Sequence, residues 1–162
     1  MFRISHFMHE LTQAEASGAY PAPRRRGGEG GALRPHTGPV VIWNLIRRCN
    51  LTCKHCYAFS ADHDYPGELS TQQVFDVMDD LHAFKVPALI LSGGEPLLRP
   101  DIFEVAERAK QLKFYVGLST NGTLIDEPLA RRIHDHGFDY VGISLDGIGA
   151  THDKFRRLEG AF

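Results

Sequence analysis

The chain has 162 residues, of which 43% are hydrophobic and 23% charged, a size and composition typical of one globular domain. Its formal net charge of -2 provides no long-range attraction to nucleic acid or to an anionic membrane surface. No apolar run approaches the roughly 20 residues that a membrane-spanning helix needs. We therefore expect a cytoplasmic protein with neither nucleic acid nor a membrane as a partner.

The first 39 residues lack the regular pattern of the rest of the chain. Residues 1–17 show a weak helical spacing of apolar side chains, which predicts an N-terminal helical segment. Residues 18–39 are rich in glycine, proline and arginine, which is typical of a flexible linker. We interpret the basic run Arg24–Arg26 as a solvated part of this linker.

From Val40 onward, strand patterns alternate with helix patterns. Short apolar runs predict strands over residues 40–46, 87–92, 114–119 and 140–144. Helices are expected to begin at Ser70, which forms a capping-box signal with Gln73, at Pro100, and at Asp126. Such alternation predicts an α/β fold with a parallel sheet and right-handed crossovers.

The only three cysteines of the chain, Cys49, Cys53 and Cys56, follow the first predicted strand. Thiolates are the preferred ligands of iron–sulfur clusters, and a four-iron cluster held by three cysteines leaves one iron open to another ligand. A zinc site completed by His55 or His63 is the alternative, although zinc sites usually have a second, well-separated ligand pair. A disulfide framework is disfavoured because three cysteines cannot all pair and no signal peptide is recognisable.

Glycine, carboxylate, amide and hydroxyl groups follow the other three strands. Gly93 and Gly94 would let a ligand approach the backbone, and the Glu95 carboxylate suits an ammonium group. Asn121 and Ser144 could bind a carboxylate or a ribose through hydrogen bonds. Each segment alone is equally compatible with an ordinary turn. Because the carboxyl ends of parallel strands open on one face, we expect all of them to converge with the cysteines.

Three motifs together resemble the radical S-adenosylmethionine (SAM) superfamily: Cys-x3-Cys-x2-Cys from Cys49, Gly-Gly-Glu-Pro from Gly93 and Ser-Leu-Asp-Gly from Ser144. The resemblance covers residues 40–162 and implies a partial parallel (β/α) barrel, truncated after about the fourth strand. This region would then be the N-terminal part of an incomplete core domain. A C-terminal domain with an auxiliary cluster would be absent, since no cysteine follows Cys56.

The resemblance also implies two cofactors and their ligands. Cys49, Cys53 and Cys56 would bind a [4Fe-4S] cluster, and the amino and carboxylate groups of SAM would bind its fourth iron. The methionine ammonium of SAM would be held by the segment Gly93, Gly94 and Glu95. Ser144 would contact the ribose or the carboxylate, and Asn121 would assist. His55 stands where the superfamily typically has an aromatic residue that packs on adenine, and it is expected to contact SAM.

Further segments, including residues 38–45, 65–70 and 138–147, resemble the NirJ-like proteins of haem d1 biosynthesis. This resemblance implies an enzyme that forms a 5′-deoxyadenosyl radical and removes two propionate side chains from the tetrapyrrole didecarboxysirohaem. The reductant would be a flavodoxin or a ferredoxin. Two alternatives stay open. One is a radical SAM enzyme that acts on a ribosomal peptide or in alternative haem synthesis, and the other is a non-catalytic zinc or iron–sulfur module.

Other conspicuous side chains are assigned structural roles. Trp43 is expected to pack within the first strand region. His134 and His136 fall at a predicted helix end, where they complement the helix dipole. His152 and Arg156 are expected to lie in a surface loop.

Overall fold

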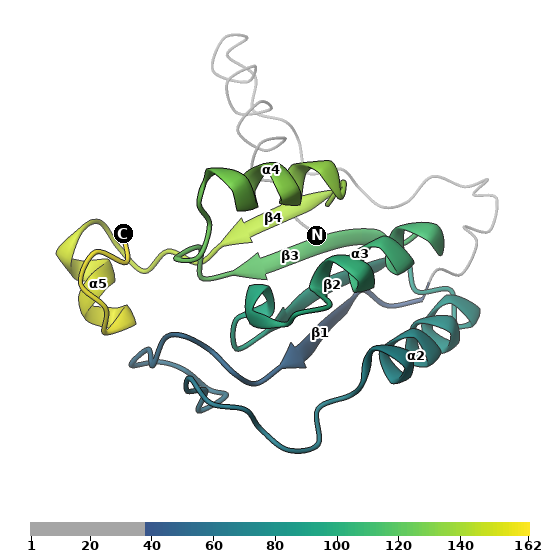
Figure 1. Ribbon diagram of the computed structural model, residues 1–162, viewed down its shortest axis with the longest axis horizontal. Coiled ribbons are helices and arrows are strands. Elements are labelled where there is room, and N and C mark those ends of the chain that lie inside the picture. The colour runs from purple at the N-terminus through teal and green to yellow at the C-terminus, as the bar shows by residue number, and fades with distance from the viewer. Residues whose placement is uncertain (1–37) are drawn as a thin grey trace, which may run out of the picture. The chain divides into compact units, whose positions relative to one another are not determined.

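The computed structural model describes residues 38–162, in which four strands form one parallel sheet (Figure 1). The strands lie in sequence order as β1 (Val41–Ile46), β2 (Ala88–Gly93), β3 (Tyr115–Thr120) and β4 (Tyr140–Ile143). The predicted parallel α/β fold is confirmed, and each strand agrees with its prediction to within one residue at either end. The N-terminal helical segment and residues 18–37 of the predicted linker lie outside the described residues.

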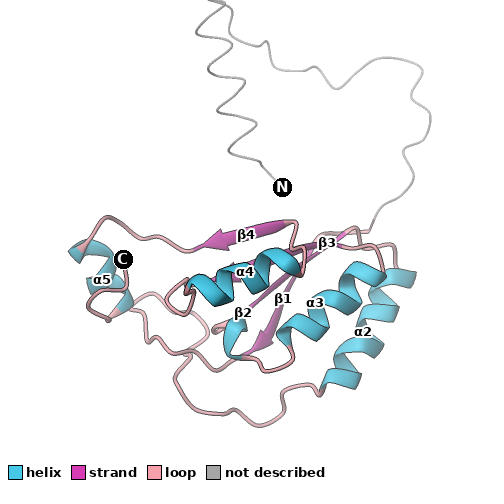
Figure 2. Ribbon diagram, turned by 45° about the horizontal axis from the view of Figure 1, so that its top comes forward, coloured by secondary structure: helices cyan, strands magenta, loops and turns pink. Residues whose placement is uncertain are grey.

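The crossover helices lie on one face of the sheet (Figure 2). They are α2 (Thr71–Ala83), α3 (Ile102–Gln111), which follows the short 3-10 helix η1 (Pro96–Leu98), and α4 (Glu127–Asp135). Apolar residues of the sheet and of α2 and α3 form the core between them, including Leu89, Leu91, Val116, Leu118, Val74, Met78, Val105 and Ala109. Within residues 38–162, no helix is both long and apolar enough to cross a membrane.

Local signals fix the helix ends. The Ser70 side chain accepts a hydrogen bond from the Gln73 N–H, and the Gln73 side chain accepts one from the Ser70 N–H, so the predicted capping box is present. The Asp126 carboxylate accepts a hydrogen bond from the Leu129 N–H at 2.9 Å. Gly137 follows α4 with a φ of 66°, a conformation that favours glycine at a helix end.

Buried Arg99 connects the elements that surround the carboxyl end of β1. Its guanidinium donates hydrogen bonds to the carbonyl oxygens of Leu45, at 3.1 Å, and Leu69, at 3.0 Å. It also forms an ion pair with Asp101, whose carboxylate accepts a hydrogen bond from Thr71 at 2.6 Å. Burial would raise the pKa of Asp101, but the hydrogen bonds from Thr71 and Arg99 outweigh it and lower the pKa. β1, the start of α2 and the start of α3 are therefore held together by one ionic network.

A further helix, α5 (Ala150–Arg156), follows β4 and was not predicted. The expected surface loop for His152 and Arg156 is wrong, because these side chains are buried, with only 1% and 7% of their surface exposed. α5 begins after Gly149, whose φ is 52°, and it has no side-chain cap. The capping signals that marked α2 and α4 are thus missing here.

Candidate functional site

The carboxyl ends of the four strands lie at the same edge of the sheet, next to the cysteine loop (residues 47–69) and α5 (Figure 1). A cavity of about 500 Å³ opens there. It is lined by residues that follow each of the four strands and by Arg156 of α5. Eight of the nine predicted site residues line it, namely Cys49, Cys53, Cys56, His55, Gly93, Gly94, Asn121 and Ser144. Glu95 is the exception.

The three cysteines are free thiols that differ in their surroundings. Cys49 is buried, and burial raises its pKa against the opposing hydrogen bond from the Leu51 N–H, 3.4 Å from its Sγ. Burial would also raise the pKa of Cys56, but hydrogen bonds from the backbone of Ser60 and its neighbours outweigh it and lower the pKa. Hydrogen-bond donors directed at sulfur stabilise the thiolate, which is the form that binds metal. Among residues 38–162, no three cysteine, histidine or carboxylate side chains form a group that could hold a single metal ion.

The two glycines also have a structural role that the sequence alone did not reveal. A Cβ added to Gly93 would lie 2.2 Å from the Ile46 carbonyl oxygen, and one added to Gly94 would lie 2.3 Å from the Arg48 carbonyl oxygen. The backbone that enters the cysteine loop therefore packs directly against both glycines and leaves no room for a side chain there. It is fixed there by hydrogen bonds from the Gly94 N–H to Ile46, at 2.7 Å, and from the Glu95 N–H to Arg48, at 2.9 Å. The glycines still line the cavity, so they place the cysteine loop beside it.

Glu95 is completely buried and does not line the cavity. Its carboxylate accepts hydrogen bonds from the Thr120 hydroxyl at 2.8 Å, the Asn121 N–H at 2.8 Å and the Leu97 N–H at 3.1 Å. Burial raises the pKa of Glu95, and the three donors oppose that rise. The Glu95 carboxylate therefore connects the end of β2 to the end of β3.

Asn121 connects the end of β3 to the cysteine loop. Its side-chain amide donates to Asn50 Oδ1 at 2.9 Å and lies 3.8 Å from Cys49 Sγ. Asn50 in turn donates to the Thr123 hydroxyl at 2.9 Å. Ser144 also lines the cavity, and its backbone N–H donates to the Thr120 carbonyl oxygen at 3.1 Å. The ends of β3 and β4 therefore carry amide and hydroxyl groups beside the thiols.

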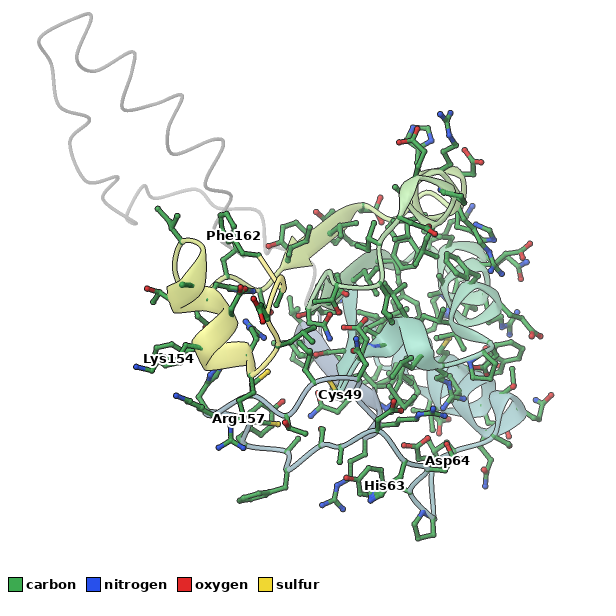
Figure 3. The ribbon with its side chains drawn as sticks, turned by 60° about the vertical axis from the view of Figure 1, so that its left-hand side comes forward. Cys49, His63, Asp64, Lys154, Arg157 and Phe162 are labelled. Atoms are coloured by element: carbon green, nitrogen blue, oxygen red, sulfur yellow. The ribbon has the colours of Figure 1, made fainter. Side chains whose placement is uncertain are left out.

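α5 closes one side of the cysteine loop, and His63 and Asp64 lie on the opposite side of that loop (Figure 3). Arg156 Nη1 lies 3.8 Å from Cys53 Sγ, and its Nε lies 2.7 Å from the Asp146 carboxylate. The other Asp146 oxygen is 3.6 Å from His55 Nε2. Sequence reasoning missed Asp146 and Arg156 as cavity residues. The spacing of His152 and Arg156, four residues apart as on one helix face, is the signal that could have found Arg156, and the place of Asp146 two residues after Ser144 could have found Asp146.

A second cavity, of about 550 Å³, is lined by Trp43 and other residues of β1, by Tyr57, Tyr65 and other residues of the cysteine loop, and by the two glycines, but by no thiol. Trp43 also packs against the core, as predicted. His136 Nδ1 lies 2.8 Å from the Arg132 carbonyl oxygen at the end of α4, in agreement with its predicted role there. The candidate functional site is therefore the thiol-lined cavity, although the cavity beside β1 has a similar volume.

Residues 43–161 match the sequence profile of the radical SAM superfamily. The chain is 53% identical over 162 residues to pre-heme d1 synthase of Dinoroseobacter shibae, covering 100% of this chain and 37% of that protein. It is 49% identical over 124 residues to Fe-coproporphyrin III synthase of Methanosarcina barkeri, covering 76% of this chain and 31% of that protein. The chain thus spans only about a third of the length of these relatives.

A solved structure with the same fold is Streptococcus suis SuiB bound to S-adenosylmethionine. It superposes with a TM-score of 0.65 at 16% identity, covering 76% of this chain and 29% of that one. At this identity the likeness concerns the fold alone. The profile match, however, extends over most of the chain and includes the cysteine loop and the ends of β2, β3 and β4. The chain belongs to the radical SAM superfamily.

Proposed function

We propose that this chain carries the iron–sulfur and SAM site of an enzyme that modifies a tetrapyrrole in haem d1 synthesis. The observation that supports the proposal most strongly is the single cavity in which three thiols meet the ends of four parallel strands. A ligand that fills it would contact sulfur on one side and amide and hydroxyl groups on the other.

The donor set fits the two cofactors. Cys49, Cys53 and Cys56 would hold a [4Fe-4S] cluster, since three thiols are what such a cluster needs when one iron is to bind another ligand. The Ser144 hydroxyl and the Asn121 amide would orient the carboxylate or the ribose of SAM. When bound, the cluster supplies the electron that breaks a carbon–sulfur bond of SAM and yields a 5′-deoxyadenosyl radical.

His55 and Glu95 contribute in different ways to this proposal. His55 lines the cavity with its ring half-exposed, and we propose that the exposed part of the ring packs on the adenine of SAM. Glu95 does not line the cavity, so we assign it to positioning Thr120 and Asn121. The methionine ammonium would then donate hydrogen bonds to backbone carbonyl oxygens of the segment that contains Gly93 and Gly94.

For the substrate, we propose didecarboxysirohaem, with removal of its two propionate side chains. The support is the 53% identity to pre-heme d1 synthase over the whole chain, which is higher than the identity to the Fe-coproporphyrin III synthase. The proposal includes a flavodoxin or ferredoxin as electron donor and a cytoplasmic location, where thiols stay reduced.

Reductive cleavage of SAM tests this function. The chain would be reconstituted anaerobically with iron and sulfide and incubated with dithionite, SAM and didecarboxysirohaem. 5′-Deoxyadenosine and the loss of propionates would be followed by mass spectrometry. We expect 5′-deoxyadenosine to form and to increase with the tetrapyrrole. Cys53→Ala should abolish it, whereas His63→Ala, in the same loop but outside the cavity, should not.

Three outcomes would contradict parts of the proposal. Turnover of Fe-coproporphyrin III or of a peptide, with didecarboxysirohaem unchanged, would favour the alternative enzymes of the superfamily. Stoichiometric zinc that is lost in His63→Ala would favour the structural metal module. Iron incorporation without any cleavage of SAM would limit the chain to a cluster-binding role.

A further inference from the structure

The cysteine loop and α5 are joined by several contacts that local sequence signals did not predict. The Lys54 N–H donates a hydrogen bond to the Phe155 carbonyl oxygen at 2.9 Å. The rings of His55 and Phe155 lie 5.9 Å apart between centroids. Arg156 then extends from the next position of α5 to Cys53. These contacts fix the position of a buried cation relative to one thiol.

The Arg156 guanidinium lies between the Asp146 carboxylate and the Cys53 sulfur. Its Nε is 2.7 Å from the Asp146 carboxylate, and its Nη1 is 3.8 Å from Cys53 Sγ, within the range for a hydrogen bond to sulfur. The Asp146 N–H donates to His152 Nδ1 at 3.2 Å, which fixes the turn that carries the carboxylate. A planar guanidinium can serve a carboxylate and a sulfur at once, which a lysine ammonium does less well. A buried arginine needs such partners, because an unpaired charge at this depth is costly.

We infer that Arg156 acts through Cys53, where its positive charge and its hydrogen bond to the sulfur raise the reduction potential of the bound cluster. The inference rests on the proposed function, since it requires that cluster. A hydrogen bond and a positive charge at a ligand sulfur stabilise the more negative, reduced state of an iron–sulfur cluster. Asp146 limits this effect because its negative charge partly cancels that of Arg156.

The midpoint potential of the reconstituted chain, measured by redox titration with electron paramagnetic resonance, tests this inference. Arg156→Met keeps much of the packing volume and removes the charge and the hydrogen bond. We expect it to make reduction of the cluster about tenfold less favourable, which is about 59 mV more negative for a one-electron couple. The matched control is Arg157→Met, which removes a cation from the next position, where the side chain is exposed. We expect little shift from it.

Asp146→Asn provides a second, opposite test that does not depend on the stability of Arg156→Met. The asparagine side chain is nearly the same size as that of Asp146, but the negative charge that pairs with Arg156 is gone, so the potential should become more positive. A role of Arg156 in stability alone would lower the melting temperature and leave both potentials unchanged, and this result would overturn the inference. If the unmodified chain binds no cluster at all, it is the proposed function that fails.

Discussion

Gly94→Ala should destabilise the chain by about 3 kcal/mol and strongly reduce the iron that it binds on reconstitution. The new methyl group would meet three backbone atoms, the Arg48 carbonyl oxygen at 2.3 Å, the Arg47 carbonyl oxygen at 2.5 Å and the Arg48 carbonyl carbon at 2.7 Å. Backbone atoms cannot rotate away as a side chain can. The hydrogen bonds from Gly94 to Ile46 and from Glu95 to Arg48 would have to lengthen or break, and the cysteine loop would move away from β2.

Gly142→Ala in β4 is the matched control for this substitution. Its methyl group would also meet a close neighbour, at 2.9 Å, but that neighbour is the exposed ring of Tyr140, which can shift. We expect a loss of less than about 1 kcal/mol and normal iron content. Urea unfolding of the two variants, together with iron determination, checks the prediction. Equal stabilities and equal iron contents would show that the close packing of Gly94 does not place the cysteine loop.

Glu95→Ala should destabilise the chain by about 3–5 kcal/mol even when no ligand is present. It would leave the Thr120 hydroxyl and the N–H groups of Asn121 and Leu97 without their acceptor in a fully buried place. Glu95→Gln should cost less, about 2 kcal/mol, because one amide oxygen replaces two carboxylate oxygens and the amide NH2 must face a donor. The free energy of unfolding of both variants, from urea denaturation, is the measurement.

Glu104→Gln and Glu107→Gln, on the exposed side of α3, are the controls for Glu95 and should change stability by less than about 0.5 kcal/mol. A stable Glu95→Gln variant whose only defect is weak SAM binding would contradict the structural role that we assign to Glu95. Glu95 would then contact the ligand directly, as the sequence motif suggested, and the cavity would have to rearrange when SAM binds.

The order of strands and helices could be predicted from the sequence because the signals are local. The β-branched run of β1, the capping box of Ser70 and Gln73, and Asp126 before α4 each act within a few residues. The convergence of eight predicted residues on one cavity then follows from the topology, since parallel strands present their carboxyl ends on the same side.

The features that the sequence did not predict depend on contacts between distant parts of the chain. The requirement for glycine at positions 93 and 94 comes from the backbone of Ile46–Arg48, and no pattern near Gly94 reveals which segment will cross it. The burial of Glu95 depends on donors from β3. α5 has seven residues, and no side chain caps its N-terminus, so its stability comes from packing against the cysteine loop rather than from local propensity. Arg156 became a candidate only because this packing places it beside Cys53.

The most direct test of the account is electron paramagnetic resonance of the anaerobically reconstituted and reduced chain, recorded with and without SAM. We expect the signal of a reduced [4Fe-4S] cluster, and we expect its shape to change when SAM is added, because the amino and carboxylate groups of SAM would bind the iron that no cysteine holds. A signal that is identical with and without SAM, or a chain that takes up only zinc, would contradict the claim that this cavity holds both cofactors.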